Sequence, residues 1–175
     1  NMFYACYDLE KLDVSKWNVD TTNGSLCDMF RNCSNVKKLD LSNWKVKLVR
    51  TTGADTFINN MFNGCSSLEY LDLSGFDLSE MNASMIYMFK DCSSLRGITS
   101  IEAWDVSKVT NFSFMFQNCS SLTKLDLRNW VTSSATTFQD MFSSCHNLEV
   151  IRVDNFDTSK VTGIGLNAMF SNCKK

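Results

Sequence analysis

Residues 61–77 read "MFNGCSSLEYLDLSGFD" and carry two hydrophobic patterns in succession. Up to Cys65, apolar residues recur at intervals of three and four, which is the spacing of one helical face. After the cysteine the interval becomes two, so that Leu71 and Leu73 point to one side of an extended segment. The stretch therefore predicts a short helix, a tight turn and a strand.

The same combination recurs along the whole chain. A Met-Phe pair followed three positions later by cysteine begins at Met2, Met29, Met61, Met88, Met115, Met141 and Met169. A unit of about 27 residues cannot bury its apolar face alone, so units of this kind stack and share a core. The sequence predicts an α/β repeat solenoid that is leucine-rich-repeat-like. It would have about six short helix-turn-strand units and a parallel sheet on its concave face.

The predicted array spans residues 1–175 as a single domain. The sequence begins and ends within the repeat pattern, without a polar capping unit. Since terminal repeats otherwise expose their stacking faces, we expect an excised or interior part of a longer protein, with neighbouring repeats or capping units beside it.

Charge and hydropathy exclude two classes of partner. Seventeen basic and nineteen acidic residues nearly cancel and no basic block occurs, so we expect no nucleic-acid binding. No apolar run approaches the ~20 residues of a membrane span, so we expect no direct membrane insertion.

The repeat resembles a known family. The pattern "MFxxCSSLxxLDLSxFDTSKVT" is similar to the short repeat of BspA-like leucine-rich repeat surface proteins, found in mycoplasma lipoproteins and Gram-positive surface proteins. The resemblance extends from Met2 to Cys173 and implies extracellular display at the cell surface. It also implies adhesion or protein binding rather than catalysis, with no catalytic residues and no cofactor. Three segments depart from the pattern: "RGITSIEAW" has an extra residue, "NWVTSSATTF" lacks the Asp-x-Ser return, and residues 45–60 hold a five-residue excess.

Seven of the eight cysteines occupy the equivalent inward position, and only Cys27 lies outside this register. A disulfide framework is one interpretation. Free thiols stacked in a buried row are the preferred one, because free cysteine packs as a small hydrophobe. A zinc site is disfavoured, since no Cys-x-x-Cys occurs and His146 is the single histidine. A nucleophile made of Cys145 and His146 is disfavoured too, because adjacent residues point in different directions.

Two sets of aspartates recur. The first lies between strand leucines, at Asp13, Asp40, Asp72 and Asp126, with Ser100 and Arg152 expected at the same position in two units. Calcium binding by this column is one interpretation. Neutralisation by Lys11, Lys38 and Lys124 two residues earlier is preferred. The second set, Asp77, Asp105 and Asp157, is expected to fix turns in Asp-x-Ser.

We expect a non-enzymatic cell-surface protein that mediates adhesion or protein–protein recognition. The partner would be a protein or a surface glycan. The alternative is a structural spacer or assembly subunit without a ligand of its own. Recognition through the sheet face would use Lys38, Asp40, Tyr70, Asp72, Ser74, Asp126 and Arg128. The competing location is the long segment of residues 45–60, with Lys47 and Arg50.

Overall fold

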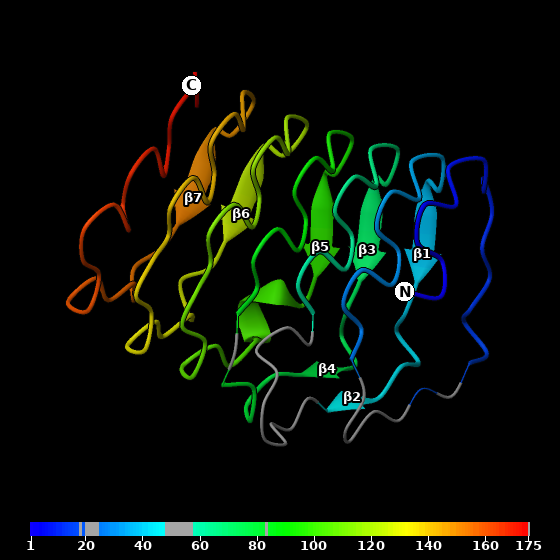
Figure 1. Ribbon diagram of the computed structural model, residues 1–175, viewed down its shortest axis with the longest axis horizontal. Helices are drawn as coiled ribbons and strands as arrows, with labels where there is room; N and C mark the ends of the chain where they lie inside the picture. The colour runs from blue at the N-terminus through cyan, green and yellow to red at the C-terminus, as the bar shows by residue number, and fades with distance from the viewer. Residues whose placement is uncertain (18, 20–24, 48–57, 83, 175) are drawn as a thin grey trace.

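A computed structural model describes residues 1–17, 19, 25–47, 58–82 and 84–174. Successive units lie side by side along the long axis of the molecule, and short strands from successive units form a row (Figure 1). These strands are β1 (Lys38–Asp40), β3 (Tyr70–Asp72), β5 (Gly97–Thr99), β6 (Lys124–Asp126) and β7 (Val150–Arg152). All fall on the segments where the hydrophobic interval is two.

The strands form small parallel sheets. One sheet has the order β1-β3-β5, and β6 pairs with β7 in another. A third sheet joins β2 (Val46–Lys47) and β4 (Phe76–Asp77), below the main row in Figure 1. In register, Leu39 lies opposite Leu71, and Leu71 opposite Ile98, so the inward residues of neighbouring strands form one buried row.

The prediction of an α/β repeat solenoid with helices is wrong. Among the described residues the one helical segment is the 3-10 turn η1 (Ile101–Ala103). In every unit from Met29 onward, the residue before the methionine and the residue before the cysteine have φ between 52° and 76°. An α-helix needs φ near −63° at each position. The Met-Phe segment is therefore a pair of successive turns, each ending in a left-handed residue.

The hydrogen bonds of these turns show why the pattern imitates a helix. The amides of Met29, Arg31 and Cys33 donate to carbonyls three residues earlier in their own unit. The alternate amides, such as that of Phe30, cross to the next unit, where Phe30 N lies 3.0 Å from Met61 O. Side chains consequently recur at helical intervals, while every second N–H stabilises the stack instead of a helix.

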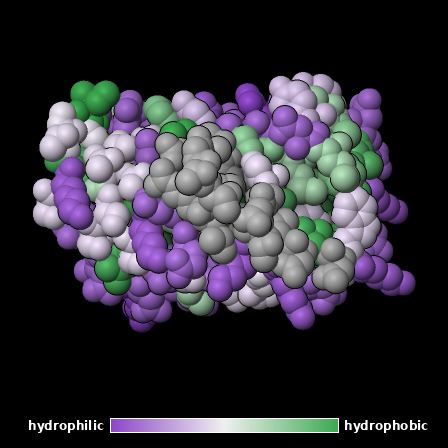
Figure 2. Space-filling view, turned by 60° about the horizontal axis from the view of Figure 1, so that its bottom comes forward, coloured by the Kyte–Doolittle hydropathy of each residue, from purple (hydrophilic) through white to green (hydrophobic). Residues whose placement is uncertain are grey.

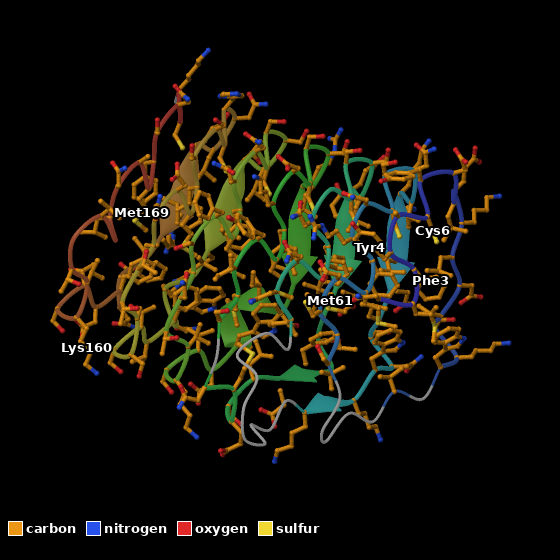
Figure 3. All side chains as sticks on the ribbon, in the orientation of Figure 1. Phe3, Tyr4, Cys6, Met61, Lys160 and Met169 are labelled. Atoms are coloured by element: carbon orange, nitrogen blue, oxygen red, sulfur yellow. The ribbon has the colours of Figure 1, made fainter. Side chains whose placement is uncertain are left out.

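Aromatic rings from successive units stack through the core. Phe3, Phe30, Phe62, Phe89, Phe116, Phe142 and Phe170 form one continuous column, with ring centroids 5.3–5.7 Å apart and interplanar angles of 15° or less. Figure 3 shows the direction of stacking: Phe3 lies at one end, Met61 near the middle and Met169 at the other end. Such offset-stacked pairs stabilise by about 0.5–1.5 kcal/mol each beyond the area they bury.

Three glycines test whether left-handed backbone maintains the fold. Gly64 has φ 76°, and a Cβ there would lie 2.3 Å from the Asn32 side chain; Gly163 has φ 57° with open space around it. We expect Gly163→Ala to lower the free energy of unfolding by about 1–2 kcal/mol and Gly64→Ala to lower it further. The matched control is Gly97→Ala, where φ is negative and the nearest atom is 3.8 Å away. Chemical denaturation measures all three, and equal effects at the three positions would contradict the assignment.

Candidate functional site

The outward side chains of β1 and β3 form a shallow groove of about 270 Å³, here called the strand-face groove. It brings together four residues predicted from the sequence: Lys38, Asp40, Tyr70 and Asp72. In register, Lys38 lies opposite Tyr70 and Asp40 opposite Asp72. The groove therefore presents an aromatic ring, a cation and two carboxylates on one surface.

Tyr70 stands at the centre of this surface. It belongs to the middle strand of the sheet, lies opposite Gly97 of β5 and is 55% exposed. Because Gly97 has no side chain, the Tyr70 ring is uncovered on that flank. Ser74, the fifth predicted residue of this part of the sheet, is not among the groove's lining residues. It donates its backbone N–H to the Asp72 carboxylate at 2.9 Å.

A second hollow of about 470 Å³ lies between β5 and β6, here called the β5–β6 cleft. It contains the remaining two predicted sheet residues, Asp126 and Arg128, which form an ion pair with each other. This pair, through its hydrogen bonds and charge, lowers the pKa of the Asp126 carboxyl. The other lining residues are Gly97, Ile98, Ile101, Glu102, Lys124, Leu125, Val150 and Arg152. The structure thus divides the predicted sheet residues between two neighbouring hollows.

Of the two residues named for the competing loop, Lys47 lines neither hollow. Lys47 ends β2, opposite Asp77 of β4, and its charge helps to lower the pKa of the Asp77 carboxyl. Arg50 and the rest of residues 48–57 lie outside the described residues.

The aspartates of both sets close turns. Asp40 accepts hydrogen bonds from the backbone N–H and the hydroxyl of Ser42 at 3.0 and 2.7 Å, and Asp77 does the same with Ser79 at 3.0 and 2.6 Å. The expected turn role of the second set is found at Asp77, Asp105 and Asp157, and the first set shares it. The serine hydrogen bonds lower the pKa of Asp13, Asp40, Asp77 and Asp157. Thr99, not Ser100, takes the place of the first aspartate in its unit, opposite Asp72.

Seven cysteines lie in a row, as predicted, with Cys27 outside it, and all eight are free. Each sulfhydryl from Cys33 onward donates to the carbonyl oxygen of the phenylalanine one unit earlier, at Sγ–O distances of 3.0–3.1 Å. Burial raises the pKa of Cys65, Cys92 and Cys119 well above the ordinary value and that of Cys145 to about 12. Cys27 is half-buried, and desolvation together with Asp28 raises its pKa to about 11.

Metal-binding and nucleophilic side chains do not converge in the described residues. No group of three His, Cys, Asp or Glu side chains there has the geometry to hold a metal ion. His146 Nδ1 lies 2.9 Å from Asn172 O, whereas the Cys145 thiol donates to Phe116 O, so the structure does not bring Cys145 and His146 together.

Sequence reasoning missed the cleft itself, including Gly97, Glu102, Lys124 and Arg152. The signal was present in the extra residue of "RGITSIEAW", which falls at the end of β5.

The face in Figure 2 shows hydrophobic residues as separate small areas among hydrophilic ones.

Comparison with known proteins identifies one family. The model of the family described as "Mycoplasma protein of unknown function, DUF285" matches residues 1–96 and again 56–175, so the two matches together span the chain. Among curated proteins, none matches. Within the part of the chain that the structure describes, no helix has the length and hydropathy to cross a membrane.

Thiol chemistry tests the cysteine row. We expect at least six cysteines to react slowly with a thiol reagent in the folded protein, because burial suppresses the reactive thiolate. All eight should react on unfolding without reductant. Mass spectrometry of the labelled protein measures both counts, and finding three or more disulfides would contradict the row of free thiols.

The aspartate turns predict loss of stability in acid. A lowered folded pKa contributes stability that is present above the unfolded pKa, ordinarily 3.8, and is lost as pH falls through the folded value. We expect the melting temperature to fall below about pH 4. Asp40→Asn combined with Asp77→Asn should lower it at pH 7 and reduce its further fall towards pH 2.5. The control is Asp154→Asn, at an exposed carboxylate that belongs to neither set of turn aspartates. An unchanged acid profile in the double variant would refute the turn role.

Proposed function

We propose, from the premise that the chain belongs to the Mycoplasma DUF285 family, that it is a non-enzymatic cell-surface protein that recognises another macromolecule through its strand face. The resemblance of its repeat to BspA-like surface proteins supports adhesion, extracellular display and a protein or surface-glycan partner. Adhesion, extracellular display and the partner are what we propose. The family match supports the broader class, a surface protein.

The observation that carries the proposal is the position of Tyr70. Binding energy at protein interfaces concentrates in a few aromatic and arginine anchors near the centre of a patch. Tyr70 is an exposed ring on the middle strand, within the strand-face groove. Lys38 and Asp40 supply charge on the neighbouring strand, which favours a polar partner surface over a purely apolar one.

The proposal also assigns a place to Arg128. Its side chain is about half exposed although it pairs with Asp126, so it can add contacts to a partner without first leaving a buried site. Tyr70 lies opposite Gly97 in register, and Gly97 and Arg128 both line the β5–β6 cleft. A partner that covers the strand-face groove and extends over β5 would reach both residues.

Substitution at these two anchors tests the proposal. We expect Tyr70→Ala combined with Arg128→Glu to weaken binding by at least ~2 kcal/mol, about 30-fold. The melting temperature should change little, because exposed substitutions usually alter stability by within about 0.5 kcal/mol. Binding is measured on a panel of purified extracellular-matrix proteins and a glycan array, followed by titration of each hit.

Two controls separate the alternatives. Tyr7→Ala removes an equally exposed ring, 54% against 55% for Tyr70, at a position away from the groove, and should leave binding intact. Deletion of residues 51–56 removes part of the long loop. If the double variant binds normally while the deletion abolishes binding, the loop is the site and the strand-face assignment is wrong. A chain that binds nothing on the panel supports the spacer function.

A further inference from the structure

The row of strands is interrupted between β5 and β6. These two strands are neighbours in Figure 1, yet no β-ladder joins them within the described residues: β5 pairs with β3, and β6 with β7. The two units remain joined on either side of the interruption. Ser121 N donates to Ser93 O at 3.1 Å before the strands, and Trp130 Nε1 donates to Ile101 O at 2.8 Å after them. The missing pairing is therefore local.

An extra residue lies at the interruption. In other units one residue separates the two inward leucines of the strand, as between Leu71 and Leu73, whereas two separate Ile98 from Ile101. Ser100 is the added residue and has φ 64°, after which the chain enters η1. A left-handed residue departs from extended backbone, so β5 ends at Thr99, before the position where the other units place their second inward leucine.

The interruption has a structural cost. Trp44 and Trp130 donate their indole N–H to carbonyls of the preceding unit, those of Val14 and Ile101. The equivalent Trp104 is buried, and its Nε1 finds no acceptor within the described residues. A buried polar group without a partner and a serine at positive φ both oppose folding. Local features that break a structural rule in this way are typical of functional sites.

The interruption leaves two strand edges facing each other. Leu127 N donates to Arg152 O of the next unit, so by the alternation of a strand the backbone groups of Lys124 and Asp126 point the other way, towards β5. In β7 the groups of Val150 and Arg152 face the preceding strand. Gly97 and Thr99 hold the equivalent places in β5, so their groups face β3 and those of Ile98 point towards β6. A strand edge of this kind presents N–H and C=O groups ready to pair with another chain.

The space between the edges is the β5–β6 cleft. Ile98, Ile101 and Leu125 are buried and supply its apolar lining. Gly97 lines it on the β5 side and adds no side chain to it. Its volume of about 470 Å³ lies within the ~300–1,000 Å³ of ligand sites.

Charge selects the occupant. Asp126 is paired with Arg128 and also lies opposite Arg152 in register. Once the Asp126–Arg128 pair is set aside, the remaining charged residues that line the cleft are two cations, Lys124 and Arg152, and one anion, Glu102. An acidic segment complements this balance better than a basic one.

We propose that the β5–β6 cleft binds an extended peptide segment of a partner protein, which adds as a strand at the interrupted position. The segment would place an apolar side chain in the row between Ile98 and Leu125, with acidic side chains outward beside Lys124 and Arg152. Main-chain hydrogen bonds then supply affinity, and the alternate side chains supply specificity. This inference rests on the proposed recognition function and names its partner chemistry.

A labelled peptide tests the cleft directly. The probe is fluorescein-Gly-Ser-Asp-Leu-Asp-Ser-Gly, titrated with the whole chain by fluorescence anisotropy. We expect saturable binding with Kd below about 1 mM. Methylation of the leucine nitrogen, which removes a backbone donor, should weaken binding at least tenfold. Absence of saturable binding, or equal binding of the methylated peptide, would overturn the proposal.

Charge reversal provides a rescue. Lys124→Glu combined with Arg152→Glu should weaken binding of the acidic peptide at least tenfold. The same variant should bind a peptide with Lys-Leu-Lys at its centre more tightly than the unchanged protein does. Lys16→Glu combined with Lys160→Glu, a charge change away from the cleft, is the matched control and should alter neither. If both pairs of substitutions act alike, the peptide responds to net charge only and the cleft is not its site.

Filling and repairing the cleft complete the test. Gly97→Val adds a side chain to the lining of the cleft at a position with negative φ. It should weaken peptide binding at least tenfold. Deletion of Ser100 restores the spacing of the other units, so β5 and β6 should pair, the melting temperature should rise and peptide binding should be lost. If the deletion does not fold, Gly97→Val decides. Unchanged peptide binding in the Val variant would show that the cleft is not the peptide's site. The proposed function is tested separately, by the binding of the Tyr70 variant to partners found in the screen.

Discussion

The structure depends on the division of backbone N–H groups in the Met-Phe segment. Alternate amides close turns within a unit and cross to the next unit, as at Cys33 and Phe30. This alternation requires a left-handed residue every fourth position, before the methionine and before the cysteine. It fixes the distance between units, and the stacked phenylalanines and the row of thiols follow from that spacing.

The hydrophobic pattern predicted the strands and the buried row of cysteines but not the local conformation of the Met-Phe segment. Two consecutive four-residue turns place side chains at the same intervals as a helix, so periodicity cannot distinguish them. The residues before the cysteines do distinguish them. Asn32, Gly64, Asp91 and Asn118 are poor helix formers that tolerate positive φ.

The candidate site could likewise be predicted only in part. An outward aromatic in a parallel row is visible from alternation, so Tyr70 and its neighbours could be placed on one surface. The cleft could not be placed, because the effect of one added residue depends on where the chain absorbs it. A bulge within the strand would have kept β5 beside β6. Instead Ser100 adopts a left-handed conformation and η1 follows, which ends the strand.

The repeat tolerates this interruption because several independent interactions hold neighbouring units together. Across the break, the Phe89 and Phe116 rings still stack at 5.3 Å, and the Cys119 thiol still donates to Phe89 O at 3.1 Å. The amide of Phe89 also still reaches Met115 O. What is lost is a three-residue ladder, whose hydrogen bonds each contribute only about 0.5–1.5 kcal/mol net. A stack with redundant contacts can therefore open one strand position to a partner while its core remains continuous.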